Sequence, residues 1–178
     1  CRKDMEDTST PTKEVISAYL RKTSTLPFSE DQLRGVVNAL TEPVSIITGL
    51  PGSGKSYSLH AVGRVLQEAG IKPLLIAPTG IAAKRITAST GISAYTIHKA
   101  FGAQNMEVTE DRQATYKGIV GSAERSLKDG SGETWSCSPE NPHQALVVVV
   151  DESSMADVHL LYRILTCTRP DARLVFVG

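Results

Sequence analysis

The chain has 178 residues, of which 40% are hydrophobic and 21% are charged, so it is long enough to bury the core of one domain. Its 19 Lys and Arg residues balance its 19 Asp and Glu residues, which excludes a protein whose overall charge attracts nucleic acid or anionic membranes. No apolar run approaches the ~18 residues of a membrane-spanning helix, so we expect no membrane span and a cytoplasmic location.

The three cysteines, Cys1, Cys137 and Cys167, are odd in number and widely spaced. None belongs to a CxxC or Cys/His ligand pattern, so we expect reduced thiols and neither disulfides nor a zinc site. The chain begins without Met and ends at Gly178. We therefore expect it to be a fragment of a longer protein.

Residues 1–27 are predicted to form an N-terminal helical and linker segment. Thr10 and Pro11 suit the start of a helix, because Pro is tolerated in the first helical turn. The apolar face of this helix is expected to contain Val15, Ile16, Tyr19 and Leu20.

A second helix is predicted within residues 28–40. Ser29 and Gln32 have the spacing of a capping box, and Phe28 precedes the cap at the position that packs onto Leu33. Apolar residues then repeat at helical spacing: Leu33, Val36, Val37 and Leu40. Gln32 has a second interpretation, because its amide both donates and accepts and so suits the edge of an adenine base. The spacing alone does not decide between the cap and the base contact.

From residue 44 onwards, short apolar strands alternate with helices. Strands are expected at 44–48, 73–77, 145–150 and 173–177, and the helices follow the first three of them. Strands this uniformly apolar are expected to be buried on both faces, as in a parallel sheet covered by helices. The predicted fold class is therefore α/β, with a parallel sheet between two layers of helices.

Residues 103–143 interrupt this alternation. They hold seven carboxylates against four Lys and Arg residues and show weak periodicity. We interpret them as an insertion on the α/β core, with a hairpin that turns at 130–132. Trp135 within this insertion is either the hydrophobic anchor of a small cluster or a side chain that stacks on a base.

The segment from Gly49 to Ser56, GLPGSGKS, matches the phosphate-loop pattern GxxxxGK[ST] in full, with a strand before it and a helix after it. In such a loop the glycines let successive N–H groups point at phosphate oxygens, at the positive end of the next helix. Lys55 is predicted to reach the β- and γ-phosphates, and the Ser56 hydroxyl is predicted to join the shell of a Mg²⁺ ion. A glycine-rich turn with an exposed lysine is the alternative, which the flanking strand and helix disfavour.

Asp151 and Glu152 follow the strand at 145–150. A carboxylate at the end of a buried strand is suited to hold Mg²⁺ beside the phosphates, directly or through water, and we assign this role to Asp151. Glu152 is suited to orient or deprotonate the attacking water. Because hydrolysis needs a base for water, the pair favours an ATPase over a small-molecule kinase. An ordinary helix cap is the alternative interpretation of such a pair.

No carboxylate occurs between residues 69 and 106. A surface rich in donors and free of negative charge suits the phosphates of single-stranded nucleic acid. Pro78 and Thr79 begin a helix there, and Thr96 begins another. Further donors in this segment are Lys84, Arg85, His98 and Lys99. The alternative is an ordinary solvated surface on which Thr79 and Thr96 only cap helices.

Together these segments resemble the superfamily-one DNA helicases, specifically the RecD-like members that move 5′ to 3′. Six segments follow the order of that family's motifs, over roughly 28–102 and 145–178. They are EDQ, GLPGSGKS, APTGIAAKRI, TGISAYTIHKAFG, VVVVDESSM and RLVFVG. The resemblance implies a RecA-like P-loop NTPase domain at 28–178. In its sheet we expect the strand at 173–177 to lie between the strands at 44–48 and 145–150, all parallel.

The resemblance also assigns roles to individual residues. The residues implied to bind ATP are Gln32, Gly49, Pro51, Gly52, Ser53, Gly54, Lys55, Ser56 and Tyr57. Ser56 and Asp151 are implied to hold Mg²⁺, and Lys55 and Glu152 are implied to be catalytic. The residues implied to contact DNA are Pro78, Thr79, Lys84, Thr96 and His98.

The partners implied by the resemblance are single-stranded DNA and a second RecA-like domain that carries an arginine finger. The third helicase motif stops here at Gly178, and the second domain is missing, so weak hydrolysis is expected from this fragment alone. A fused or associated nuclease or relaxase is a further implied partner. The alternatives are a P-loop kinase, for which we find no Arg-rich lid, and a nucleotide-gated DNA-binding or relaxase-associated domain without unwinding activity.

Overall fold

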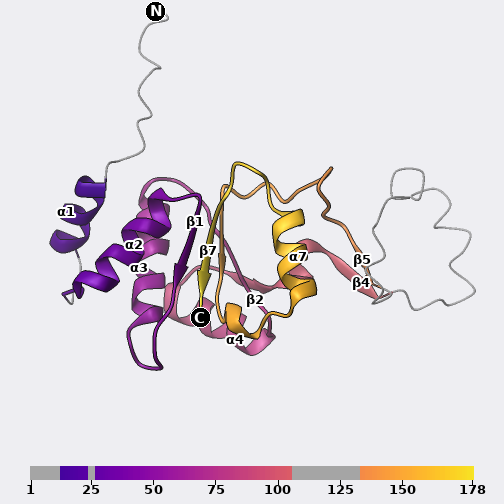
Figure 1. Ribbon diagram of the computed structural model, residues 1–178, viewed down its shortest axis with the longest axis horizontal. Helices are drawn as coiled ribbons and strands as arrows, with labels where there is room; N and C mark the ends of the chain where they lie inside the picture. The colour runs from indigo at the N-terminus through magenta and orange to yellow at the C-terminus, as the bar shows by residue number, and fades with distance from the viewer. Residues whose placement is uncertain (1–12, 24–26, 106–132) are drawn as a thin grey trace, which may run out of the picture.

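The structure is a computed structural model that describes residues 13–23, 27–105 and 133–178 (Figure 1). Its main element is a five-stranded parallel sheet of order β1-β7-β6-β2-β3. The strands are β1 (Val44–Ile47), β2 (Leu74–Ala77), β3 (Ala94–Thr96), β6 (Val147–Val150) and β7 (Arg173–Val177). Strand β7 pairs with β1 on one side and with β6 on the other, so the predicted strand order is confirmed.

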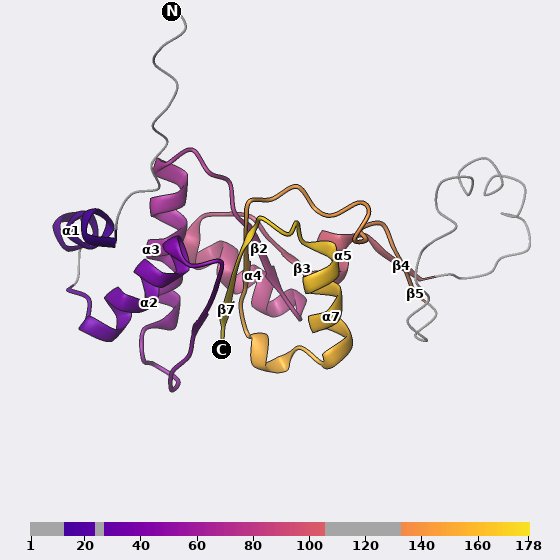
Figure 2. The ribbon, with the colours of Figure 1, turned by 45° about the horizontal axis from the view of Figure 1, so that its top comes forward.

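Helices lie on both sides of this sheet, with α2 and α3 on one side and α7 on the other (Figures 1 and 2). The α-helices are α1 (Lys13–Thr23), α2 (Glu30–Thr41), α3 (Lys55–Glu68), α4 (Gly80–Thr90), α5 (Ile97–Phe101) and α7 (Val158–Cys167). Gly91 ends α4 in the left-handed conformation, as the sequence predicts. The α/β fold class is confirmed.

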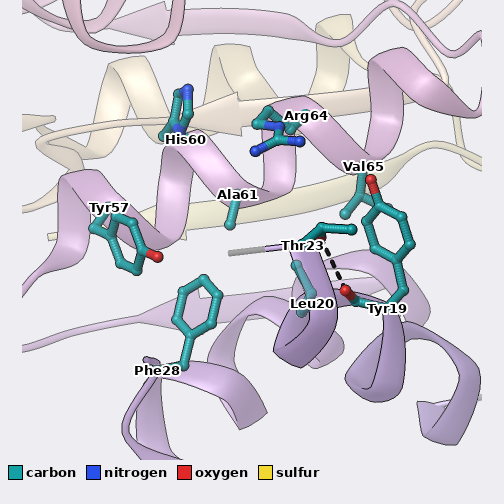
Figure 3. Close-up of a pocket in the computed structure, with 9 residues that line it drawn as sticks. All are labelled: Tyr19, Leu20, Thr23, Phe28, Tyr57, His60, Ala61, Arg64 and Val65. Carbon is teal, nitrogen blue, oxygen red and sulfur yellow. Dashed lines mark hydrogen bonds between the residues drawn. The ribbon is translucent and has the colours of Figure 1, made fainter. Parts of the chain in front are cut away.

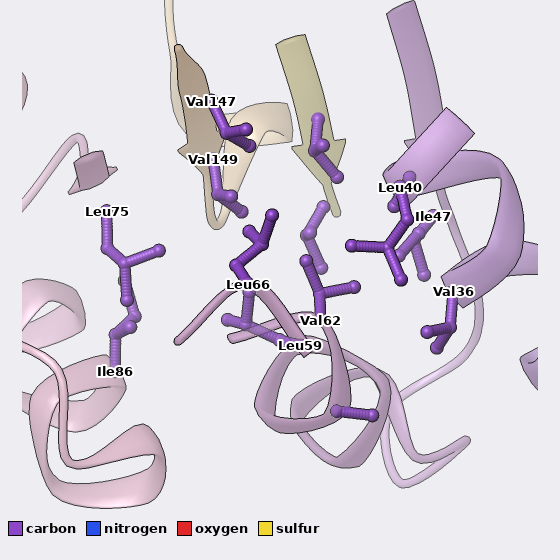
Figure 4. Close-up of a cluster of buried hydrophobic side chains, with 14 of the residues drawn as sticks. Val36, Leu40, Ile47, Leu59, Val62, Leu66, Leu75, Ile86, Val147 and Val149 are labelled. Atoms are coloured by element: carbon purple, nitrogen blue, oxygen red, sulfur yellow. The ribbon is translucent and has the colours of Figure 1, made fainter. Parts of the chain in front are cut away.

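The alternation of side chains along each strand divides the core into two clusters. Leu75, Val147 and Val149 pack with α1, α2, α3 and α4 in the first cluster, part of which Figure 4 shows. Ile76 and Val150, one position along, pack with α5 and α7 in the second cluster. Strands β2 and β6 are therefore buried at every position, as predicted.

Strand β1 departs from this prediction. Ser45 and Ile47 are buried, but Val44 is 58% exposed and Ile46 is 70% exposed. The cause is its place at the end of the strand order, where one face of the strand is left uncovered by the helices that the structure describes. On α1, Ile16 and Leu20 are buried as predicted, but Val15 is 58% exposed, so the prediction was wrong at that one position.

A separate antiparallel pair, β4 (Ala103–Asn105) with β5 (Glu133–Trp135), lies at the two ends of the proposed insertion. The Trp135 side chain is only 6% exposed and belongs to the second cluster, where the Arg163 guanidinium lies 5.3 Å from its ring centre. Trp135 is thus a hydrophobic anchor. The hairpin turn predicted at 130–132 lies outside the described residues.

Cys137 and Cys167 are both free thiols, while Cys1 lies outside the described residues. The Cys167 Sγ donates to the Cys137 carbonyl at 3.1 Å, and burial raises the pKa of Cys167 to about 11. Within the described ranges, none of the helices has the length and apolar character needed to cross a bilayer.

Candidate nucleotide site and adjacent groove

The loop between β1 and α3 depends on its glycines. Gly52 has φ +79° and Gly54 has φ +88°, a region that other residues rarely adopt. A Cβ on Gly54 would lie 2.4 Å from the Gln32 Nε2, and a Cβ on Gly49 would lie 2.5 Å from the Ser53 Oγ. A side chain at Gly54 or Gly49 would therefore displace the Gln32 amide or the Ser53 hydroxyl.

Helix α3 begins differently from the other helices. Among the α-helices whose N-caps lie in the described residues, only α3 begins without a side-chain cap, because its N-cap is Gly54. The side chains that cap the others are Ser29 for α2, Thr79 for α4, Thr96 for α5 and Asp157 for α7. The first N–H groups of α3 thus keep their capacity to bind an anion at the positive end of the helix.

Lys55, the first residue of α3, folds back over the loop. Its Nζ donates to the Gly49 carbonyl at 2.5 Å and to the Leu50 carbonyl at 3.2 Å. Both bonds are to neutral acceptors, whereas a phosphate offers a charged acceptor and a stronger bond. The amine is thus held beside the loop by contacts that phosphate oxygens can replace.

A cavity of about 670 Å³ opens in front of this loop. The predicted residues that line it are Pro51, Gly52, Gly54, Lys55, Ser56, Asp151 and Glu152. Arg85 and Gly178 line it as well. The cavity therefore brings the phosphate loop and the acidic pair together, although they are about a hundred residues apart in the chain.

Asp151 and Glu152 stand at the end of β6. Burial raises the pKa of the Asp151 carboxyl, while the charges of Arg85 and Lys55 act in the opposite direction. Asp151 Oδ1 accepts a hydrogen bond from the Glu152 N–H at 2.9 Å. Glu152 has φ +50°, and it is the only non-glycine among the described residues with a positive φ. Its carboxylate forms an ion pair with Arg85.

The donor set fits ATP and Mg²⁺. Uncapped N–H groups and Lys55 suit the phosphates, and the Ser56 hydroxyl with the Asp151 carboxylate suits a hard cation that keeps several other oxygen ligands. Among the described residues, at this cavity as elsewhere, no three or more His, Cys, Asp or Glu side chains gather in a group that could hold a metal ion. A cation at this cavity would thus complete its shell with phosphate oxygens and water.

Gln32 is tied to the phosphate loop through the capping box. Its Oε1 accepts from the Ser29 N–H at 3.0 Å, and its own N–H donates to the Ser29 Oγ at 3.2 Å, so the predicted cap is confirmed. The Gln32 Nε2 donates to the Ser53 carbonyl at 2.9 Å. No pattern in the sequence indicates this third bond, which joins α2 to the loop. The contact with adenine stays a prediction.

Tyr57 does not line the nucleotide cavity. Its ring lies 4.7 Å, centroid to centroid, from that of Phe28. Both rings border a separate small pocket of about 60 Å³, together with Tyr19, His60 and Arg64 (Figure 3). Although Tyr57 directly follows Ser56, the turn of the helix directs it to this second pocket.

A groove of about 510 Å³ runs along the other side of α4. The predicted residues Lys84 and Thr96 both line it, together with Thr87 and Lys99. The Thr79 and Thr96 hydroxyls each accept a backbone N–H at 3.2 Å, so both residues do cap helices. His98 is not brought to this groove, since its ring stacks on Trp135 with centroids 5.3 Å apart.

Arg85 is the residue whose place sequence reasoning missed. The sequence places it among the donors expected to face nucleic acid, but it lines the nucleotide cavity. Neighbouring residues on a helix point about 100° apart, so Lys84 and Arg85 face different sites. That periodicity is the signal that separates them, once the position of α4 on the sheet is known.

Comparison with known proteins gives a family for this chain. The family described as "AAA domain" matches residues 32–178. The RecBCD enzyme subunit RecD of Haemophilus influenzae is 28% identical over 196 residues, which cover 93% of this chain and 29% of that protein. The ATP-dependent RecD2 DNA helicase of Deinococcus radiodurans is 28% identical over 152 residues, which cover 84% of this chain and 17% of that protein.

The fold is also found among solved structures. The crystal structure of Pif1 helicase from Candida albicans matches with a TM-score of 0.51 and 22% identity, over 86% of this chain and 32% of that one. The chain thus spans less than a third of each of these relatives. The resemblance to RecD-like superfamily-one helicases and the RecA-like α/β fold are confirmed, and the chain belongs to the AAA domain family.

Proposed function

We propose that this chain is the ATP-binding motor domain of a cytoplasmic DNA helicase, which hydrolyses ATP with Mg²⁺ as it moves 5′ to 3′ along single-stranded DNA. The observation that carries this proposal is the cavity shared by Lys55, Ser56, Asp151 and Glu152. The relative from Deinococcus radiodurans, which is named an ATP-dependent DNA helicase, supports the same activity.

In this proposal the chain holds the phosphates through the first N–H groups of α3 and through Lys55. Ser56 and Asp151 hold Mg²⁺, which when bound neutralises charge on the β- and γ-phosphates. Glu152 orients the attacking water and accepts its proton. Gln32 supports the loop through the Ser53 carbonyl, and its contact with the adenine base is proposed from the family resemblance.

Single-stranded DNA is proposed to lie in the groove beside α4. Lys84 and Lys99 supply positive charge there, and Thr96 supplies a hydroxyl. A hydroxyl that accepts a cap bond still has its own proton to donate to a phosphate, so the caps at Thr79 and Thr96 are compatible with DNA contacts. Pro78 and His98 remain predicted contacts, with His98 the weaker because of its stacking on Trp135.

The proposed partners extend beyond this chain. A second RecA-like domain would close on the nucleotide and supply the arginine finger, and a fused or associated nuclease or relaxase is the further partner we propose. The domain itself is proposed to span 28–178, with an insertion at 103–143. The Haemophilus influenzae relative is named as a subunit of a larger enzyme, which supports an assembly of this kind.

The test is ATP turnover by the intact protein with and without single-stranded DNA. Stimulation of about tenfold or more supports the proposal, since it shows that the DNA groove and the nucleotide cavity are coupled. Turnover that DNA does not change contradicts it, and turnover that requires a phosphate acceptor indicates a kinase. Displacement of a duplex with a 5′ tail, but not of one with a 3′ tail, tests direction. DNA-stimulated turnover without displacement indicates the binding module instead.

A further inference from the structure

Two adjacent cations on α4 face two different sites. Lys84 lines the groove with Thr96 and Lys99, whereas Arg85 lines the nucleotide cavity with Glu152. The buried residues Ala82, Ala83 and Ile86 of the same helix anchor it in the first core cluster. Helix α4 therefore borders both sites. A small displacement of this helix would change the positions of Lys84 in the groove and of Arg85 in the nucleotide cavity.

Arg85 reaches across the cavity to the acidic pair. Its Nη2 forms an ion pair with the Glu152 Oε1. The Arg85 side chain is 63% exposed and the Glu152 side chain is 27% exposed, so the pair lies at the rim of the cavity. An exposed pair contributes little to folding stability, and its loss is not expected to unfold the domain.

The backbone of Glu152 is fixed without the help of Arg85. The Glu152 N–H donates to the Asp151 Oδ1 at 2.9 Å, and the Glu152 carbonyl accepts from the Met155 N–H at 2.9 Å. Ser153 Oγ adds a bond to the Val177 carbonyl at 3.1 Å. These bonds leave the side-chain torsions of Glu152 as its main freedom, and the guanidinium of Arg85 selects among them.

We propose that Arg85 is a positioning residue, which holds Glu152 away from its productive orientation until DNA occupies the groove on the other side of α4. This inference rests on the proposed function, which makes Glu152 the base for water. The ion pair with the guanidinium fixes the direction in which the Glu152 carboxylate points, so the carboxylate is not free to turn toward the attacking water. DNA contacts that favour a displaced α4 would separate the pair and release the base.

The experiment compares the wild-type protein with Arg85→Ala in the intact chain. Steady-state turnover is measured against ATP concentration, without DNA and with saturating oligo-dT. The expected result is a kcat without DNA that rises by up to about fivefold, the upper end of the range that loss of one exposed ion pair supports. The KM for ATP and the kcat with DNA stay at wild-type values, so the stimulation by DNA falls by the same factor.

Three further variants separate the proposed role from general effects. Arg85→Lys keeps a positive charge and is expected to restore part of the restraint. Arg169→Ala removes an Arg that pairs with Asp171 at 2.6 Å outside the cavity, and it is expected to leave both kcat values unchanged. Lys84→Ala is expected to raise the oligo-dT concentration needed for half-maximal stimulation, a change that Arg85→Ala does not produce.

Two results would overturn the inference. A kcat without DNA that stays the same or falls in Arg85→Ala shows that Arg85 does not restrain Glu152. A raised KM for ATP at unchanged kcat shows that Arg85 contacts the phosphates instead. If oligo-dT leaves wild-type turnover unchanged, the proposed function fails, and the comparison of the DNA-free kcat values still decides whether Arg85 restrains the base.

Discussion

The turns from β1 to α3 and from β2 to α4 lie at the same edge of one parallel sheet, yet they are built in different ways. The first runs through a glycine loop to a helix whose end lacks a side-chain cap. The second runs through Pro78 to Thr79, whose hydroxyl caps α4 at 3.2 Å. At an uncapped helix end the first backbone N–H groups are left for a ligand, whereas at a capped end one of these N–H groups already donates to the capping side chain. The residue before the helix thus decides whether the helix end can bind a ligand or only stabilises the fold.

The strongest way to break this comparison is Lys55→Ala at the binding turn. Because Lys55 is the charged side chain of that turn, we expect ATP turnover to fall by about 10²–10³-fold or more. Affinity for labelled single-stranded DNA, measured by fluorescence anisotropy, is expected to change little, because the proposed groove lies across α4. Loss of DNA binding with turnover intact would reverse the assignment of the two sites.

The glycines offer a matched pair, Gly54→Ala and Gly80→Ala. At Gly54 the φ of +88° and the contact with Gln32 Nε2 predict a loss of nucleotide affinity and about 1–3 kcal/mol of stability. At Gly80 an added Cβ meets nothing within 4 Å, so Ala is expected to be neutral or to stabilise by up to about 1 kcal/mol. Chemical denaturation and nucleotide titration measure both. Equal losses in the two variants would show that the loop conformation is not what matters.

Gln32→Ala and Ser29→Ala distinguish the roles of the capping box. Each variant removes one of the two bonds of the box: Ser29→Ala removes the N-cap oxygen and is expected to cost about 1 kcal/mol of stability, whereas Gln32→Ala keeps that bond through its backbone N–H and removes only the return bond to the Ser29 N–H. Only Gln32→Ala also removes the bond to the Ser53 carbonyl, so only this variant is expected to weaken nucleotide binding. Titration of Gln32→Ala with ATP and GTP shows why its nucleotide affinity falls. An equal loss of affinity for both nucleotides indicates that Gln32 supports the loop, and a loss of affinity for ATP alone indicates that Gln32 contacts adenine. Identical affinities in the two variants would leave Gln32 with the cap alone.

The smallest expected effect is at the supporting turn. Thr79→Ala removes the cap of α4 and is expected to cost about 1 kcal/mol, which lowers the Tm of a domain of this size by about 2–4 °C. Thr79→Ser keeps the hydroxyl and serves as the control, with a Tm close to that of the wild type. An unchanged Tm in Thr79→Ala would mean that water replaces the cap with no loss of stability. The two turns would then differ only in whether the helix end can bind a ligand.

The features that follow from the sequence depend on neighbours along the chain. The capping box at Ser29 forms with both of its bonds, and Gly91 ends α4 with φ +72°. The complete burial of β2 and β6 likewise follows from their unbroken apolar runs. In these cases the structure that the local sequence pattern favours is also the one that the packing of the domain requires, so the pattern alone predicts it.

The features that the sequence could not supply depend on where an element lies in space. Val44 and Ile46 of β1 are as apolar as the residues of the buried strands, but the place of β1 at the end of the strand order leaves both exposed. Tyr57 follows the phosphate loop directly, yet the rotation of α3 turns it toward Phe28. Arg85 and Lys84 look equivalent in a positive segment, and only the placement of α4 sends them to different sites.

The buried thiol of Cys167 gives this protein a natural chemical reporter of its own opening motions. The thiolate is the form that attacks an alkylating reagent, and Cys167 has no exposed surface and a pKa raised to about 11. Labelling with iodoacetamide therefore requires that α7 separate from the sheet, and its rate measures how often that layer opens. Mass spectrometry of the labelled peptide thus measures how often α7 separates transiently from the sheet, without any introduced probe.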